Sequence, residues 1–458
     1  MRFVHVFLAV LLAAAAGGCQ SSHGTAPADD PTASYTPEQL REDLDHLEQA
    51  VAQRHPRFHD RVPDAALTRA FGEAREALDV PMSRAEAFRV LAQVNPAFAD
   101  AHTLLMPTFA LEALASGGGF PLNIRIRHDG ALVVAGNWQR ENGAERLAEG
   151  ILIRSINGET TDALLEDLSR YGHGETAALR QHMLAALFPH WLAAIRGWTD
   201  DFRLEVEQDG VLRQLQIVAG DQWAEVDAAA MPDRPTLRDL GDGIALMRLP
   251  TFDVDDDPDA YRTAVESLFG ALRQGGATGL VLDVRGNTGG QSDAGAQVIR
   301  YLIDRPVNQV SRARERLNEA NRGILGYKGK VGQMREMDLS RDGLIKPARA
   351  TERFDGEVVV LIDAMTYSAG ILFATTLQDH QLATVIGQPT GGHANQTGNM
   401  EQVHLPNTGL MAYIPARIFV RPNGESGTSP VIPDLIVKPA VGDGDPFLGA
   451  AVKYLSAR

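Results

Sequence analysis

A serine stands where an apolar, strand-like stretch of the sequence gives way to a helix-like one. In residues 361–380, LIDAMTYSAGILFATTLQDH, the switch falls at Ser368, between Tyr367 and Ala369. One interpretation is that Thr366 or Ser368 is simply the N-cap of the helix, with its hydroxyl oxygen accepting an orphan backbone N–H. The other is that Ser368 is a nucleophile at a helix N-terminus, where free amides can hold a developing oxyanion. Because caps are far commoner than nucleophiles, the stretch alone favours the cap.

A second group of polar residues follows another apolar run. The segment LVLDVRGNTGG carries these residues at the end of a buried strand: Asp283, Arg285, Asn287, Gly289 and Gly290. Glycines in such a place let a backbone amide approach a substrate closely. A plain tight turn is the simpler explanation of a bare Gly-Gly pair, so this segment alone does not establish a site.

Length and composition limit the classes of protein and of site. A chain of 458 residues is too long for one core, so we expect two to four domains. The formal net charge of −16, without a basic cluster, argues against a nucleic-acid partner. The 13 histidines lack a paired spacing such as H-E-x-x-H, and the glycine runs lack the Lys-Ser/Thr of a phosphate loop. We therefore expect neither a metal nor another cofactor.

The N-terminus is typical of export. A basic residue, an apolar run and small residues lead to Cys19, the only cysteine of the chain. A lone cysteine after AAGG resembles a bacterial lipobox, so we predict a lipoprotein-type signal peptide over 1–19 and a flexible tether over 20–34. An ordinary signal peptide is the alternative. The resemblance implies the periplasmic side of the cell envelope, with a membrane contact only through the lipid, and Gln20 indicates the outer membrane if the host is Gram-negative.

Three further segments differ in their periodicity. Residues 35–110 repeat apolar side chains at helical spacing, which predicts an N-terminal helical domain. Residues 111–222 alternate strand patterns with Gly-containing turns, and the order of a GGGF loop, a GILIRSING strand and a closing hairpin resembles a PDZ domain with a helical insert around 176–196. Residues 234–458 alternate buried strands with helices, which predicts an α/β core.

The order of the motifs resembles the tricorn and C-terminal-processing (tail-specific) serine peptidases. D-x-R-x-N-x-G-G on one strand is followed about eighty residues later by T-Y-S-A-G at the end of another. QPTGGHANQTGN and NGESGTSPVIPDLIV match later segments of the family, and RHP and DAHT match the helical domain before the PDZ-like module. The resemblance implies a crotonase/ClpP-like ββα superhelix as the catalytic core, and it reverses the preference for a mere cap.

The resemblance also assigns a nucleophile and its oxyanion hole. It implies Ser368 as the nucleophile, and the amide of Ala369 with an amide from Gly289 or Gly290 as the donors. A serine hydroxyl is a weak nucleophile and needs a base within hydrogen-bond reach. The tetrahedral oxyanion needs preorganised donors, and loss of one costs about a hundredfold or more in rate.

The family uses two kinds of base. Tail-specific members use a lysine about twenty-five residues after the serine, a position held here by His393. Tricorn-like members use a histidine before the PDZ-like module, here His102, oriented by a late glutamate, here Glu425. The resemblance favours His102, whose residue type suits a general base near neutral pH. Ala101 and Ile371 depart from the residues that many members carry beside the base and the nucleophile.

The predicted function is hydrolysis of peptide bonds in protein or peptide substrates by a cell-envelope serine endopeptidase. The PDZ-like module is expected to receive peptide C-termini on the amides of Gly118, Gly119 and Phe120. Two other functions stay open: a catalytically silent relative that binds peptides or apolar ligands, and an acyl hydrolase acting on a non-peptide ester. The oligomeric state and the natural substrate do not follow from the sequence.

Overall fold

The computed structural model describes residues 33–458, except 59–63, 116–117, 128, 141–144, 219–222, 226–233, 255, 325 and 439–443. Cys19, the predicted signal peptide and nearly all of the predicted tether therefore lie outside the described residues. The described residues form two compact units. The first comprises those of Gly17–Ala230 together with Met400–Pro415, and the second those of Met231–Asn399 and Ala416–Arg458. No described helix is long and apolar enough to cross a membrane.

The first unit begins with the helices that the apolar spacing predicts. Thr36 and Gln39 form a capping box at the start of α2, and Pro37 occupies the first helical position. Leu40, Leu44 and other α2 side chains at this spacing have no exposed surface, which confirms the predicted helix. The helices of this unit are α2 (Pro37–Arg54), α4 (Asp64–Ala77), α5 (Arg84–Leu91), η1 (Ala92–Val94), α6 (Asn95–Phe98), α7 (Thr108–Ala115), α8 (Thr161–Ser169), α9 (Ala177–Ala186), α10 (Phe188–Trp191) and η2 (Leu192–Arg196).

The first unit also contains an antiparallel sheet with the strand order β11-β10-β8-β5-β4, and β9 pairs with β8. Two of the Gly-containing turns expected within 111–222 are present, at Asn157-Gly158 and Asp209-Gly210, and each pair has positive φ angles, as tight hairpins require. The strands of this unit are β1 (Ser34–Tyr35), β2 (Met82–Ser83), β3 (Leu104–Met106), β4 (Ile124–Ile126), β5 (Leu132–Val134), β6 (Trp138–Arg140), β7 (Arg146–Leu147), β8 (Leu152–Ile156), β9 (Glu159–Thr160), β10 (Asp201–Gln208), β11 (Val211–Val218) and β12 (Trp223–Glu225).

The second unit is built on a sheet with the order β13-β14-β15-β18-β19-β22, in which all neighbours after β13 are parallel. Every residue of β15 is buried, and so are all of β18 after its first, which confirms the covered strands predicted from their apolar runs. The strands of this sheet are β13 (Thr236–Gly241), β14 (Ile244–Arg248), β15 (Gly279–Asp283), β18 (Glu357–Ile362), β19 (Thr384–Gly387) and β22 (Leu435–Ile436).

Helices cover both faces of this sheet. On one face, Val281, Val359 and Leu361 pack with Ala451 and Leu455 of α15 in one hydrophobic cluster. Helices α12 and α14 lie side by side on the other, where Phe252 and Phe373 are in ring contact. The helices of this unit are α11 (Pro258–Gln274), α12 (Ser292–Ile299), α13 (Glu319–Ile324), η4 (Ala350–Glu352), α14 (Ala369–Asp379) and α15 (Pro446–Ser456). The unit is thus a mixed α/β layer structure.

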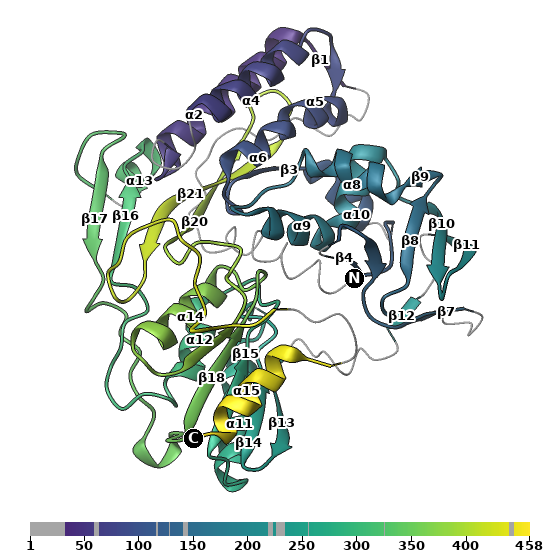
Figure 1. The fold of residues 1–458 in the computed structure, drawn as a ribbon. Coiled ribbons are helices and arrows are strands. Elements are labelled where there is room, and N and C mark those ends of the chain that lie inside the picture. The colour runs from purple at the N-terminus through teal and green to yellow at the C-terminus, as the bar shows by residue number, and fades with distance from the viewer. Residues whose placement is uncertain are drawn as a thin grey trace. The chain divides into compact units, whose positions relative to one another are not determined.

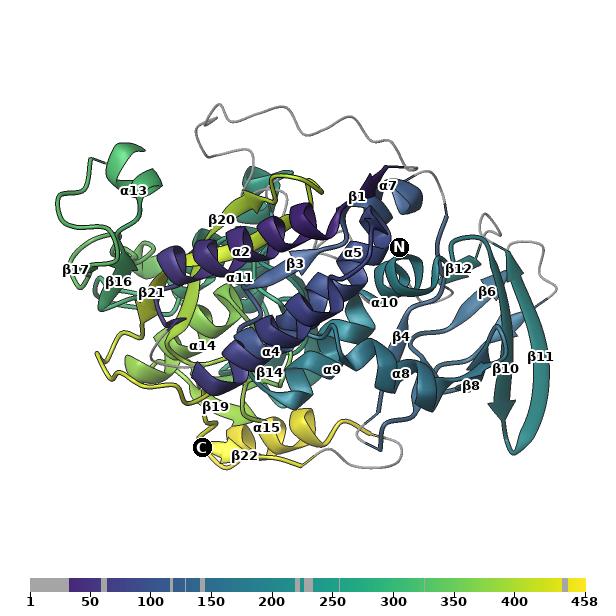
Figure 2. The ribbon, with the colours of Figure 1, turned by 90° about the horizontal axis from the view of Figure 1, so that it is seen from above.

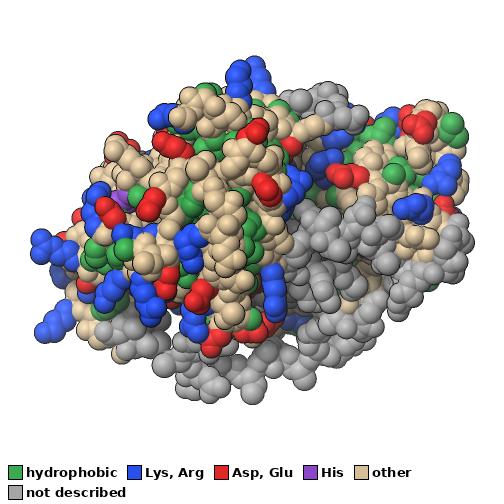
Figure 3. All heavy atoms as spheres, turned by 90° about the horizontal axis from the view of Figure 1, so that it is seen from below, with side chains coloured by type: hydrophobic (Ala, Val, Ile, Leu, Met, Phe, Trp, Pro, Cys, Tyr) green, Lys and Arg blue, Asp and Glu red, His purple; other side chains and the backbone are tan. Residues whose placement is uncertain are grey.

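The chain passes between the units within two long strands, β20 (Gln396–His404) and β21 (Met411–Val420). In the first unit, Met411–Tyr413 of β21 pair antiparallel with β3. In the second unit, the end of β21 pairs with β16 (Arg312–Arg316), which pairs with β17 (Met334–Asp338). The range 234–458, expected to form one domain, is therefore interrupted, because Met400–Pro415 cluster with the first unit. On the face drawn in Figure 3, acidic and basic side chains of the described residues are interspersed.

Candidate active site

Ser368 occupies the turn that joins β18 to α14. It is the residue before the first helical position, with φ 49° and ψ −121°, and its hydroxyl makes no capping bond to the helix. The hydroxyl of Thr366 instead donates to the carbonyl of Val284 at 2.9 Å. The cap interpretation is therefore wrong for both residues. A non-glycine residue in this region of backbone space costs about 1–3 kcal/mol, a strain typical of functional turns.

The backbone of the glycine loop lies directly against this turn. A Cβ atom on Gly289, whose φ is +109°, would stand 2.6 Å from the Ser368 Cβ and 2.9 Å from the Ala369 nitrogen. Only glycine allows such an approach. Asn287 fixes the loop, because its Nδ2 donates to the carbonyl of Leu249 at 3.0 Å and its own carbonyl accepts from the amide of Tyr367 at 2.9 Å.

The two glycine amides differ in what they offer a ligand. The amide of Gly289 donates to Asn287 Oδ1 at 2.8 Å, so it is engaged within the loop. Among the described residues, the amides of Gly290 and Ala369 have no hydrogen-bond partner. Of the two glycines named from the sequence, Gly290 is therefore the one whose amide is available, and Gly289 provides the close approach to Ser368 and Ala369.

The remaining polar residues of the D-x-R-x-N segment hold the sheet to α15. Arg285 donates to Asp283 at 2.9 and 2.8 Å and to Asp445 at 2.9 and 2.7 Å. Asp445 in turn caps α15. Burial acts against the charge of Arg285, but its two carboxylate partners raise the pKa of the guanidinium well above its ordinary value. Asp283 and Arg285 thus fix the position of the strand end that leads into the glycine loop.

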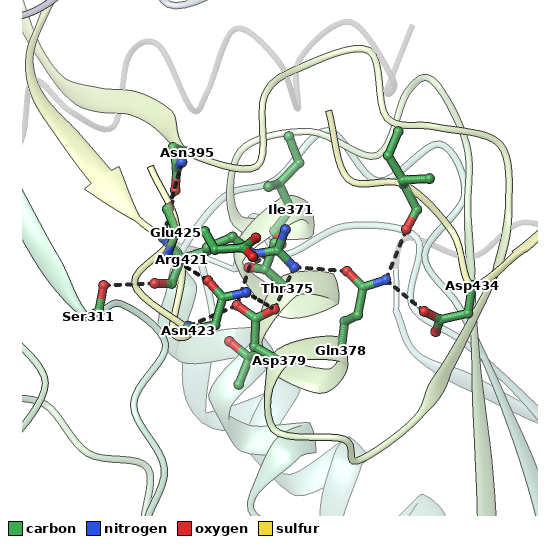
Figure 4. Close-up of polar contacts among 12 residues, drawn as sticks. Ser311, Ile371, Thr375, Gln378, Asp379, Asn395, Arg421, Asn423, Glu425 and Asp434 are labelled. Carbon is green, nitrogen blue, oxygen red and sulfur yellow. Dashed lines mark hydrogen bonds and ion pairs between the residues drawn. The ribbon is translucent and has the colours of Figure 1, made fainter. Parts of the chain in front are cut away.

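Glu425 lies in an exposed loop after β21 that is anchored on the C-terminal end of α14 (Figure 4). Arg421 forms an ion pair with Asp379, with Nε at 2.9 Å from the carboxylate. The amide of Asn423 donates to the same carboxylate at 3.1 Å, and the amide of Glu425 donates to Asn423 Oδ1 at 2.8 Å. The buried Asp379, with a 3% exposed side chain, therefore determines where this loop sits.

Two consecutive residues connect the glutamate loop to the serine turn. Asn395 Nδ2 donates to the carbonyls of Glu425 at 2.9 Å and Gly427 at 3.2 Å, and Gln396 Nε2 donates to the carbonyl of Ser368 at 2.8 Å. The structure thus brings Ser368 and the loop of Glu425 together on one peptide segment. His393 lies two residues earlier in this segment, where its backbone forms a bridge with Pro430.

His102 lies in the tight turn between α6 and β3, in the first unit, and its side chain is only 8% exposed. Its amide donates to Asp100 Oδ1 at 2.8 Å, and its ring Nδ1 is 3.9 Å from the same oxygen. Ser368, Ala369, both glycines and Glu425 belong to the second unit. Asp100 is the first residue of the DAHT motif, and the motif alone predicts no role for it.

Part of the loop expected to receive a peptide carboxylate is already engaged in contacts within the first unit. The amide of Gly119 donates to the carbonyl of Thr199 at 2.6 Å, and a Cβ on this residue would meet Leu114 of α7 at 2.5 Å. The ring of Phe120 is 3% exposed and packs edge-on against Phe188 and Phe202. Gly119 is therefore not an available donor, and Phe120 is a core residue.

Sequence reasoning missed Asn395, Gln396 and the ion pair of Arg421 with Asp379. Asn395 and Gln396 stand inside the QPTGGHANQTGN segment, but side chains that bond to distant carbonyls leave no local pattern. No signal marks Asp379 in the sequence, because it resembles any acidic residue at a helix end.

Comparison with known proteins finds similarity to one peptidase family over part of the chain. Residues 243–437 match the model of Peptidase family S41. The tail-specific protease of Haemophilus influenzae is 28% identical over 193 residues, which are 42% of this chain but only 23% of that protein.

Solved structures share the fold at low identity. Mature CPAF has a TM-score of 0.62 at 15% identity, over 87% of this chain and 92% of that one. Mature CPAF complexed with lactacystin has a TM-score of 0.65 at 15% identity, over 92% and 97% of the two chains. The family match and the curated relative agree that residues 243–437 are similar to the serine-type peptidases of family S41.

Proposed function

We propose that this chain is a serine endopeptidase that cleaves protein or peptide substrates through an acyl-enzyme. The observation that carries the proposal is the strained, non-capping Ser368 in contact with the glycine loop, together with the unengaged amides of Ala369 and Gly290. A hydroxyl presented in this way can attack a carbonyl, and one donor at a helix N-terminus with a second from the glycine loop can hold the resulting oxyanion. We expect the catalytic unit to be of the crotonase/ClpP-like type.

The reaction needs a base and an orienting group, and we assign these roles to His102 and Glu425. His102 would take the proton of the Ser368 hydroxyl as the oxygen attacks the scissile carbonyl. It would return that proton to the leaving amine, and a water molecule would then release the acyl group by the same two steps. His393 is the alternative base. Its backbone bridge to Pro430 supports a packing role instead, because the bridge ties it to the chain segment that follows Glu425.

The assignment is tested by four variants, each checked for folding: Ser368→Ala, His102→Ala, His393→Ala and Glu425→Gln. Loss of the nucleophile or base should lower kcat by several orders of magnitude. Glu425→Gln should cost less, and His393→Ala about tenfold through loop packing. Near-normal turnover of His102→Ala together with an inactive His393→Ala would transfer the role of base to His393.

Two assays separate the proposed function from its alternatives. A fluorophosphonate should label the wild-type chain on Ser368 and leave Ser368→Ala unlabelled, whereas a silent relative would not react. Labelled protein that hydrolyses simple esters but not casein would instead be an acyl hydrolase.

We infer that the antiparallel sheet of the first unit is a PDZ-like module that binds peptide C-termini by strand addition. Because the Gly119 amide is engaged, the amides of Gly118 and Phe120 are the donors left in this loop for a carboxylate. A peptide with a free C-terminus should bind more tightly than its amidated form. Equal affinity would mean that the loop only closes the fold.

We further propose that Cys19 carries a lipid that anchors the protein at the periplasmic side of the envelope, in the outer membrane if the host is Gram-negative. The support is the lone cysteine after small residues. Cys19→Ser should move the protein from the membrane fraction to the soluble fraction, and an unchanged distribution would remove the anchor.

A further inference from the structure

Asp100 is a fully buried carboxylate in the turn that carries His102. It has no exposed surface and lies two residues before His102. One oxygen, Oδ1, accepts the amide N–H of His102 at 2.8 Å and stands 3.9 Å from the ring Nδ1 of the same residue. The other oxygen, Oδ2, is 2.9 Å from Nε2 of His55, at the end of α2. Both oxygens thus act as acceptors, as an ionised carboxylate does.

The tautomer of His55 follows from its second nitrogen. The amide of Arg57 donates to His55 Nδ1 at 3.1 Å, so Nδ1 is the acceptor and carries no proton. A neutral His55 must therefore hold its proton on Nε2 and donate it to Asp100. His55 is itself buried, with a 3% exposed side chain, so this arrangement is shielded from competing water. It fixes Asp100 in one orientation, with Oδ1 directed to His102.

We propose that Asp100 is a positioning residue for His102, holding the backbone of its turn in place and stabilising the protonated form of its ring, and that His55 keeps Asp100 aligned. The inference rests on the proposed role of His102 as general base. In that role His102 becomes positively charged while the oxyanion forms, and a buried anion at this distance favours the charged form. Glu425, the proposed orienting group, is by contrast exposed, so solvent would weaken the interaction of its charge with a cationic ring.

Other titratable groups of the first unit lie close to this turn. Glu175 accepts the amide of Ala101 at 3.2 Å. His173 is fully buried and interacts electrostatically with both Asp100 and His102; burial lowers its pKa to about 4, so it is neutral near pH 7. Asp100 is therefore the fully buried anion among these groups, and the half-buried Glu175 offers a neighbouring carboxylate for comparison.

The test measures the pKa of His102 directly and does not require activity. In the full-length Ser368→Ala chain with isotope-labelled histidines, the His102 resonance is assigned by its loss in His102→Gln and titrated by NMR. Asp100→Asn should lower the pKa of His102 by about one pH unit or more, because an anion near the ring is removed. Glu175→Gln should change it less. His55→Ala should also lower the pKa of His102, but by less than Asp100→Asn does.

Kinetics provide the second measurement. A general base contributes about 10²–10⁴-fold, so Asp100→Asn should cost part of that in kcat with little change in KM. Neutral His102 is the active form, so the acid limb of kcat/KM should move to lower pH when its pKa falls. If the wild-type chain proves to have no peptidase activity, the proposed function fails while the NMR titration still decides the role of Asp100.

The result that would overturn the inference is a folded Asp100→Asn chain in which the pKa of His102 and the acid limb are unchanged, whatever its thermal stability. Such a carboxylate would serve only to close the turn. If Asp100→Asn does not fold, His55→Ala and Glu175→Gln decide the matter, because an unchanged pKa of His102 in His55→Ala would equally contradict the role.

Discussion

Gly289→Ala should abolish most activity by forcing the glycine loop away from Ser368. The new Cβ would stand 2.6 Å from the Ser368 Cβ, whereas carbon atoms in contact lie about 3.5–4.0 Å apart. The loop must therefore retreat by about 1 Å, and a misplacement of that size can cost about a hundredfold in rate. The amide of Gly290 moves with the loop, and loss of one oxyanion donor costs about 10²–10³-fold in kcat.

The same substitution also strains the fold. At a φ of +109° an alanine is strained even where its Cβ has room. This backbone strain and the overpacking against Ser368 should together lower the free energy of unfolding by roughly 2–5 kcal/mol. Gly286→Ala is the matched control in the same loop. Its φ is +74° and no atom lies within 4 Å of the added Cβ, so it carries only the backbone cost of about 1–2 kcal/mol.

The assay is hydrolysis of a chromogenic peptide by both variants, at a temperature well below their unfolding midpoints. Gly289→Ala should lose about 100- to 1000-fold in kcat, while Gly286→Ala should stay within about threefold of wild type because it moves nothing near the serine. If Gly289→Ala matched Gly286→Ala in turnover while remaining folded, the loop would not form the oxyanion site.

Three further outcomes follow from the charges described. Asp379→Asn should lower the free energy of unfolding by about 1.5–3 kcal/mol, because the partly buried Arg421 loses its carboxylate partner. It should also lower kcat by loosening the loop of Glu425. Asp379→Glu, measured beside it by urea unfolding and turnover, should recover part of both. Burial raises the pKa of Asp445, but the Arg285 guanidinium outweighs burial, and the pKa is lowered overall. The stability lost in Asp445→Asn should therefore be constant above about pH 5 and vanish as the pH falls below about 4. Unfolded His173 takes up a proton near pH 6.5 but the folded side chain only near pH 4. As the pH is lowered from about 6.5 to about 4, the melting temperature of the wild type should therefore fall more steeply than that of His173→Gln.

Local patterns in the sequence were enough to predict most elements. The β15 and β18 strands have apolar residues on both faces, and only a covered sheet accommodates such runs. The start of α2 combines a capping threonine with proline at the first position. These features depend on neighbours a few residues away, so they can be read without the tertiary structure.

Features that depend on distant residues could not be predicted in this way. Nothing local indicates that Met400–Pro415 join the first unit, because their pairing partners are about 300 residues earlier. The same reason hides Gln396, whose side chain finds the carbonyl of Ser368 only in the folded chain. The choice between cap and presented hydroxyl also required the backbone angles of Ser368. The order of the motifs favoured a presented hydroxyl, whereas the residues around Ser368 alone favoured a helix cap.

The pairing of β3 with β21 has a consequence for the order of events during synthesis. The strand that follows His102 obtains its partner, Met411–Tyr413, only after about nine tenths of the chain has been made. Contacts of such long sequence separation form late and slow folding. The turn that carries His102 therefore cannot be completed on a nascent chain that still lacks this strand. With His102 in its proposed role of base, such a protein would stay inert while it is being translated, and its own unfinished segments would be spared from cleavage.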